Sequence, residues 1–237
     1  MLNYATRSPT KTISAVGKRD MFDDLRRKLP TEEFDYQALL DTLREYDRPR
    51  DKITNLLRQG AIVRIKKGIY VFGEKYRRTP LSREVLANMI YGPSYISLDY
   101  ALHYYGMIPE RVESVTSVTC NRGRRFSTPV GLFIYRGISM NAYQIGIDQI
   151  SLDRGRTFLM AIPEKALSDK IHDDRGTSIR TQAEMRTHLL DNLRIDPEWL
   201  KKLDAEVISI IADRYHSRKI RLMSSLLSKF SKRKNNE

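Results

Sequence analysis

The chain is poor in the features that define several common classes of protein. It contains one cysteine, Cys120, which rules out an intramolecular disulfide framework and fits a reducing cytoplasm. No run of about 18 apolar residues occurs, and the first twenty residues lack the apolar centre of a signal peptide. We therefore expect a soluble, cytoplasmic protein with no membrane partner.

Common motifs of catalysis and ligand binding are also missing. The sequence has no GxxxxGK(S/T), GxGxxG or GxSxG pattern, so it lacks the usual phosphate-binding loops and the hydrolase nucleophile elbow. The histidines are dispersed and have no metal-ligand spacing: His103, His172, His188 and His216. We expect no metal ion, no cofactor and no enzymatic activity.

One segment keeps a catalytic alternative open. The stretch "IPEKALSDK" brings carboxylates and lysines together, and two further acids precede it. The residues are Glu164, Lys165, Asp169 and Lys170, with Asp148 or Asp153. Carboxylates beside a lysine could hold a divalent metal and a phosphate, as in a DNA-targeted nuclease. Acids near the start of a helix also complement its dipole, which is the simpler explanation.

What the chain does have is an excess of positive charge. Lysine and arginine number 42 against 29 acidic residues, which gives a formal net charge of +13. Residues 1–80 carry 18 basic and 11 acidic groups, so they hold +7 of that excess. This balance favours a polyanionic partner such as nucleic acid.

The segment "LLRQGAIVRIKKGIYVFG", residues 56–73, joins a helix end to a β-hairpin. Gly60 stands where helices commonly stop, and the two β-rich runs flank a turn that contains Gly68. Upstream, the apolar residues of "DYQALLDTLREY" and "RDKITNLLRQ" recur at helical spacing. Two amphipathic helices followed by a hairpin predict a winged helix-turn-helix.

The outward face of the second helix has the chemistry of DNA recognition. Arginine and lysine suit phosphates or guanine edges, and asparagine and glutamine suit adenine edges. A solvated helix face uses the same residue types, which is the alternative. Together with the lysines of the hairpin turn, the predicted DNA-binding residues are Arg48, Arg50, Lys52, Asn55, Arg58, Gln59, Lys66 and Lys67.

Downstream of the charged "EKYRRTP" segment the pattern changes. Two helices are predicted, then four strands from "VESVTSVTC", "VGLFIYRGI", "YQIGIDQIS" and "RTFLMAI", then a helix at "PEKALSDKIH" and three more within 181–231. The fold class is α+β: an N-terminal winged helix and a larger mixed α/β domain with a central sheet and C-terminal helices. The predicted divisions are a flexible arm at 1–19, the winged helix at 20–78, the α/β domain at 81–231 and a basic tail at 232–237.

Five short phrases in order resemble the type IV abortive-infection antitoxins, the AbiEi family of bacterial toxin-antitoxin systems. They are "LLRQGAIVRIKKGIYV", "YGPSYISLDYALHYYGMIPE", "VTSVTCNRGRRF", "GLFIYRGI" and "AIPEKALSDKIH", within residues 35–172. The resemblance implies a phage-defence protein with two roles. Its winged helix would repress its own operon at inverted repeats, and its C-terminal domain would neutralise a cognate nucleotidyltransferase toxin. The polar extension before residue 20 and the basic C-terminus depart from the family pattern.

Several points stay open at this level. Neutralisation could run through direct contact, with a cationic loop at Arg122, Arg124 and Arg125, or through a nucleic-acid target that both proteins share. We expect two molecules on each inverted-repeat operator, and an antitoxin function that residues from 81 onward perform alone. The main alternative is a winged-helix regulator whose C-terminal domain senses a ligand or dimerises.

Overall fold

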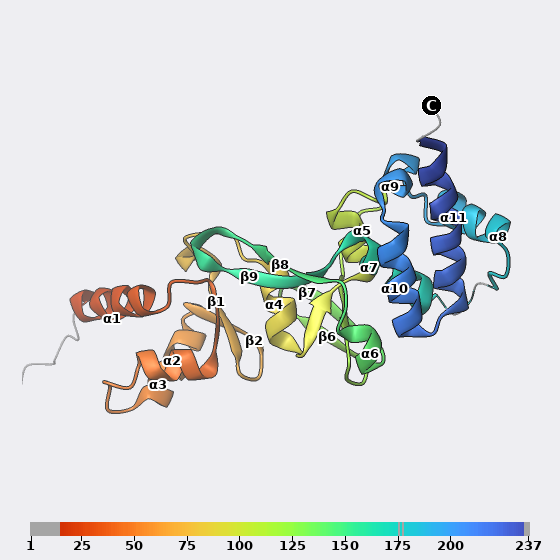
Figure 1. The fold of residues 1–237 in the computed structure, drawn as a ribbon. Coiled ribbons are helices and arrows are strands. Elements are labelled where there is room, and N and C mark those ends of the chain that lie inside the picture. Colours follow the sequence, from red (N-terminus) through yellow and green to blue (C-terminus); the bar gives the residue numbers. More distant parts are fainter. Residues whose placement is uncertain (1–14, 175, 177, 235–237) are drawn as a thin grey trace, which may run out of the picture.

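A computed structural model describes residues 15–174, 176 and 178–234. Three helices and a small sheet lie at one end of the molecule, a larger sheet lies in the middle, and the last helices lie at the other end (Figure 1). Both helices and strands contribute throughout, so the chain belongs to the α+β class. In the part described, no helix is long and apolar enough to cross a membrane.

The N-terminal region consists of three helices and three short strands. The strands form an antiparallel sheet in the order β1-β3-β2. In chain order the elements are α1 (Ala15–Lys28), β1 (Glu33–Asp35), α2 (Tyr36–Thr42), α3 (Pro49–Arg58), β2 (Ile62–Lys66) and β3 (Ile69–Phe72).

Local sequence signals explain most of these boundaries. Asp35 caps α2 by accepting a hydrogen bond from the Ala38 amide (2.7 Å), and proline begins α3, where its missing N–H costs nothing. Gly60 (φ 67°) and Gly68 (φ 88°) supply the left-handed conformations that end α3 and turn the hairpin. The predicted hairpin is confirmed within a residue.

A six-stranded mixed sheet forms the centre, in the order β6-β7-β5-β4-β9-β8. The pairs β5–β7 and β4–β9 are parallel, and the others are antiparallel. The strands are β4 (Ser94–Ile96), β5 (Val115–Thr119), β6 (Arg124–Thr128), β7 (Gly131–Gly137), β8 (Ile147–Ser151) and β9 (Thr157–Ala161).

Helices cover both faces of this sheet. Helix α4 (Arg83–Ile90) lies on the face of Tyr135, whose hydroxyl donates to the Ala87 carbonyl (2.6 Å). On the other face, Thr116 accepts from the Tyr100 amide (3.1 Å) in α5 (Leu98–Tyr104). The remaining helices, which continue from this face to the far end, are α6 (Met140–Tyr143), α7 (Pro163–Asp173), α8 (Gln182–Thr187), α9 (Pro197–Lys202), α10 (Ala205–Tyr215) and α11 (Arg218–Lys234).

Several predicted boundaries were wrong. Helix α1 begins at Ala15, inside the predicted arm, while residues 1–14 lie outside the described part. Helix α11 runs to Lys234, so the first three residues of the predicted tail are helical, and 235–237 lie outside the described part. The segment 181–231 holds four α-helices and a short π-helix where three helices were predicted. The strands β4 and β6 were not predicted at all, because β4 has only three residues and β6 begins with two arginines.

Candidate nucleic-acid interface

Helix α3 is amphipathic and turns its polar side to solvent. Its buried side chains, Ile53 and Leu56, pack into an N-terminal hydrophobic cluster with Leu25, Leu39 and Phe72. That cluster fixes the rotation of the helix, since the apolar stripe must face inward. The opposite stripe is consequently held outward as a rigid, prearranged surface.

Most of the residues predicted to contact DNA lie on this stripe. The exposed members are Arg48, Asn55, Arg58 and Gln59. Arg50 is exposed too, but helical spacing places it on the side of Ile53 and Leu57, at the edge of the apolar stripe. Lys52 is half-buried, with its Nζ 5.3 Å from the centroid of the Tyr46 ring. The one ion pair of this helix within the described residues joins Arg48 to Asp51 at 4.0 Å, between side chains that are 83% and 68% exposed. Such an exposed contact is weak, so the guanidinium groups remain available to an anion.

The two lysines of the hairpin turn differ from each other. Lys67 is exposed, as predicted. Lys66 instead folds back on the protein: its Nζ donates to the carbonyl of Ile90 (2.7 Å) at the end of α4 and lies 4.7 Å from the centroid of the Phe126 ring. The expectation that the turn directs both lysines outward therefore holds for Lys67 and fails for Lys66.

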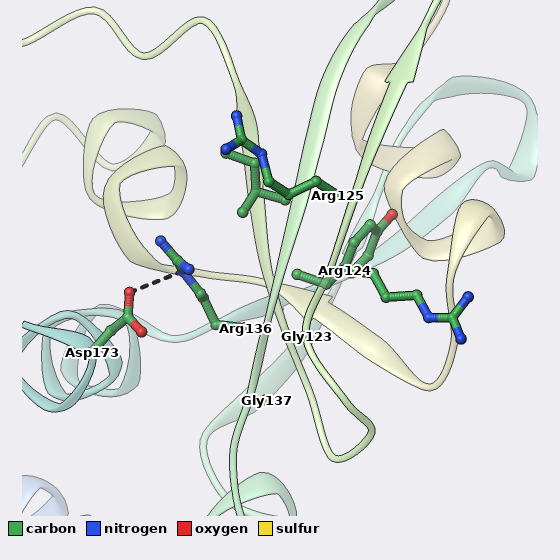
Figure 2. Close-up of a pocket in the computed structure, with 8 residues that line it drawn as sticks. Gly123, Arg124, Arg125, Arg136, Gly137 and Asp173 are labelled. Atoms are coloured by element: carbon green, nitrogen blue, oxygen red, sulfur yellow. Dashed lines mark ion pairs between the residues drawn. The ribbon is translucent and has the colours of Figure 1, made fainter.

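The three arginines predicted to form one cationic loop do not lie together, because two of them belong to strand β6. Arg124 and Arg125 are consecutive residues of β6, so their side chains point to opposite faces of the sheet (Figure 2). Arg124 lies with its Cζ 5.4 Å from the Tyr91 ring centroid. Arg122 precedes the strand, is exposed, and accepts a hydrogen bond at its carbonyl from the Tyr91 hydroxyl (3.0 Å).

Arg125 shares its face with Arg136, a residue that the sequence did not single out. Arg136 lies opposite Gly123 across the β6–β7 pair, and its Nε is 3.1 Å from a carboxylate oxygen of Asp173 in α7 (Figure 2). These side chains line an open hollow of about 740 Å³ together with Arg124, Ile134, Tyr135 and Gly137. On the face of Arg125 and Arg136, two guanidinium groups stand against one carboxylate, while the guanidinium group of Arg124 lies on the opposite face, over the Tyr91 ring. The charge on that face suits an anion.

Of the six residues suspected of nuclease chemistry, Lys165 and Asp169 are buried and the other four are half-buried or exposed. Lys165 and Asp169 are 0% and 2% exposed, and the lysine Nζ donates to the Asp169 carboxylate (2.5 Å) and contacts the Tyr215 hydroxyl (2.7 Å). The other oxygen of Asp169 accepts from Tyr95 (2.9 Å) and Ser97 (2.7 Å). Burial lowers the pKa of Lys165, and the neighbouring Asp169 partly opposes that shift.

This cluster ties α7 and α10 to the sheet. Burial, followed by the charge of Asp169, raises the pKa of both Tyr95 and Tyr215, so both phenols stay protonated and donate. Ser97, the N-cap residue of α5, donates to Asp169 and makes no side-chain capping bond. The remaining suspects are dispersed: Glu164 accepts from the Asp204 amide, Lys170 pairs with Asp99, Asp148 lies on β8 and Asp153 pairs with Arg156. Among the described residues, no group of three or more His, Cys, Asp or Glu could hold a metal ion.

A second buried ionic cluster, which no sequence pattern predicted, lies between α1 and the β8–β9 hairpin. Arg26 (2% exposed) donates to both oxygens of Glu32 (0% exposed) at 2.8 and 3.0 Å. Glu33 accepts from the Ser82 amide (2.6 Å) and from Arg156 (3.3 Å). No local pattern predicts the pairing of Glu33 with Arg156, because these residues are 123 positions apart.

The two carboxylates of this cluster are shifted in opposite directions. Burial raises the pKa of Glu33 above its ordinary value. Burial also acts on Glu32, but Arg26 and the amides of Arg78 and Thr79 outweigh it, so the pKa of Glu32 lies below its ordinary value. The ionised form of Glu32 is therefore the one that this cluster stabilises.

Comparisons of the whole sequence with models of known protein families and with characterised proteins gave no match.

Proposed function

We propose that the chain is a DNA-binding autorepressor and antitoxin, which reads operator DNA with an N-terminal winged helix-turn-helix. The order of elements, α1-β1-α2-α3-β2-β3, with a sheet in the order β1-β3-β2, supports a winged helix. In such a motif the second helix of the helix-turn-helix enters the major groove. Here that helix is α3.

The observation that carries the proposal is the exposed polar stripe of α3. Asn55, Arg58 and Gln59 project from a helix whose opposite side is locked into a hydrophobic cluster. A helix fits the major groove of B-DNA, and these side chains can make paired hydrogen bonds with adenine or guanine edges. Arg48 and Arg50, at the start of the helix, suit the flanking phosphates.

The turn between β2 and β3 supports a second, non-specific contact. Lys67 is exposed there and would meet the DNA backbone beside the groove occupied by α3. Lys66 is excluded from this role in the proposal, since its ammonium group is held by the Ile90 carbonyl. One phosphate contact at the turn is therefore expected, and not two.

The antitoxin half of the proposal is supported by the resemblance to the AbiEi family. The partner would be a nucleotidyltransferase toxin, neutralised directly or through a nucleic-acid target that both proteins bind. We assign toxin neutralisation to the six-stranded sheet and its helices, which lie beyond the N-terminal region. In this proposal the buried Lys165–Asp169 cluster stabilises the fold and contacts no partner, because its polar atoms are hydrogen-bonded to one another.

DNA recognition can be tested by measuring binding to the promoter of the chain's own operon and to random DNA. Asn55→Ala and Arg58→Ala should each weaken promoter binding by about 1–3 kcal/mol and random binding much less. Lys67→Ala should weaken both alike and lower the salt slope by about one unit. Arg111→Ala is the matched control, since Arg111 is 84% exposed and lies ahead of β5. Equal losses on both DNAs for every α3 variant would overturn the assignment of α3.

Stoichiometry is a separate test of the same proposal. One short helix reads few base pairs, so specificity requires two copies on half-sites about one helical turn, or a multiple, apart. We expect two molecules per operator on an inverted repeat. Saturation of one asymmetric site by a single molecule would contradict this arrangement.

Antitoxin activity can be separated from repression by using the full chain. Toxin and antitoxin would be expressed from unrelated promoters, with growth as the readout. The native chain and the double variant Asn55→Ala/Arg58→Ala should rescue growth equally, because neither residue contributes to the second role. Failure of the native chain to rescue, at equal abundance of toxin, would refute the antitoxin half and leave the DNA-binding half untouched.

A further inference from the structure

The edge strand β6 leaves one side of its backbone unpaired. It is the outermost strand of the six-stranded sheet and pairs with β7 alone. Across the described residues, no backbone hydrogen bond of 124–128 is made outside that pair. Arg124, Arg125 and Ser127 are exposed along it. An open edge of this kind is a template on which another strand can add.

The two arginines restrict what can add there. They are consecutive, so one guanidinium group lies on each face of the sheet, as Figure 2 shows. Arg125 forms no side-chain hydrogen bond or ion pair within the described part of the chain, and Arg124 contacts the Tyr91 ring. Arg136 reinforces the positive charge on the side of Arg125, although it is shared with Asp173.

Charge argues against a second copy of β6 as the occupant. Pairing β6 with another β6 would place arginine beside arginine, and like charges opposed across a strand pair are destabilising. Opposite charges in the same positions are stabilising. An incoming strand with two consecutive acidic residues would place one carboxylate on each face, beside Arg124 and Arg125.

The open backbone distinguishes a peptide from a nucleic acid. An unpaired strand edge presents both N–H donors and C=O acceptors. Phosphate oxygens can accept from the donors, but they leave the carbonyl groups without a partner. A peptide strand satisfies both kinds of group, and its alternating side chains reach both arginines.

We propose that β6 is a docking edge for an extended acidic segment of a partner protein, which adds as a seventh strand and pairs two consecutive acidic residues with Arg124 and Arg125. The hollow lined by Arg125 and Arg136 leaves room on that face for side chains of the added strand. The proposal is independent of DNA recognition by α3.

The test uses the full chain and synthetic eight-residue peptides of alternating valine and threonine. One peptide has two consecutive glutamates at its centre, and matched peptides have two lysines or two glutamines. A further diglutamate peptide is N-methylated at alternate positions, which blocks strand pairing but keeps the charge. Binding is measured by fluorescence anisotropy, and hydrogen exchange is measured for the amides of 124–128.

The diglutamate peptide should bind at least tenfold more tightly than the dilysine peptide and should protect the amides of β6. In the double variant Arg124→Glu/Arg125→Glu the preference should reverse in favour of the dilysine peptide. The control Arg214→Glu, at an exposed position in α10, should leave the preference unchanged. A reversal cannot come from misfolding, since an unfolded edge would bind neither peptide.

Three results would overturn the proposal. One is equal binding of the N-methylated peptide, which would make the contact a charge effect without strand addition. Another is protection of β6 by single-stranded DNA that displaces the peptide, which would make the edge a nucleic-acid surface. The last is absence of binding at millimolar peptide, which would show that the edge does not accept an acidic strand; concentration-dependent protection of β6 by the chain itself would then assign the edge to a second copy.

Discussion

The two hydrophobic cores of the chain differ in which segments supply their side chains. The N-terminal core is built from residues of the first 72 positions, with Phe34, Leu56 and Phe72 among its members. The larger core surrounds the six-stranded sheet, yet it also includes Ile69 and Val71 from the small N-terminal sheet. Strand β3 therefore sends alternate side chains into different cores, Tyr70 and Phe72 into one and Ile69 and Val71 into the other.

This sharing bears on the idea that residues from 81 onward act alone. A fragment that begins at 81 would lose the apolar side chains by which β2 and β3 complete the larger core. It would also lose Glu33, which Arg156 and the Ser82 amide contact at the end of the β8–β9 hairpin. We therefore expect the two parts to unfold together and the N-terminal helices to be held in a fixed orientation.

The largest expected effect comes from truncating one core residue in each region. Phe72→Ala in the small core and Leu167→Ala in the larger one should each cost about 3–5 kcal/mol of unfolding free energy. If the cores are coupled, each variant lowers the midpoint of one common transition in calorimetry. Two separate transitions, of which each variant shifts only one, would show that the shared strand does not couple them.

A smaller effect is expected at the ionic cluster between the regions. Glu32→Gln removes the charge that binds Arg26 and should cost roughly 3 kcal/mol at neutral pH. The pKa of Glu32 is lowered in the folded chain, so its ionised form contributes stability at pH values above 4.5, and this contribution declines as pH falls toward the folded pKa. Urea unfolding should therefore show the difference from the native chain shrinking on acidification.

Glu33 supplies a matched control for that pH dependence. Its pKa is raised by burial, so its stabilising form is the protonated one, and its contribution is lost as pH rises through the folded pKa. The unfolding free energy of Glu33→Gln, relative to that of the native chain, should therefore be higher at neutral pH than in acid. The same pH trend for both variants would contradict the assignment of opposite shifts.

The smallest predicted effect distinguishes the two lysines of the β2–β3 turn. Lys66→Met should lower stability by about 1 kcal/mol, because it removes a hydrogen bond to the Ile90 carbonyl and a contact with the Phe126 ring. It should leave the salt dependence of DNA binding unchanged. Lys67→Met should do the reverse, with unaltered stability and a salt slope reduced by about one unit. If both variants change only DNA binding, Lys66 is not held as the structure indicates.

Local signals in the sequence were enough to predict the helix and the hairpin that form the candidate interface. Helical periodicity, a proline at the start of α3 and glycines at its end and at the hairpin turn placed these elements within a few residues. The outward face of α3 followed from the same periodicity. Lys165 and Asp169, four residues apart on one helix, also offered a local signal for a buried pair, which the nuclease hypothesis misread.

What the sequence could not supply were contacts between distant segments. Lys66 meets a carbonyl 24 residues away, and Arg136 meets Asp173 from another element. Strand β6 has a polar, arginine-rich sequence that is typical of a turn, and its conformation depends on pairing with β7. Single-residue patterns carry no information on such pairings, so the division of the three predicted arginines between two faces could not be foreseen.

In the proposed complex, α3 lies in the major groove of operator DNA. Its most direct test is site-specific photocross-linking in a Cys120→Ser background, with an azidophenacyl group attached through Asn55→Cys. A matched probe at Gln149→Cys, exposed on β8, is the control. We expect cross-links from position 55 to bases of a half-site and none from position 149. Operator binding without cross-links from position 55, or with cross-links from position 149 alone, would contradict it.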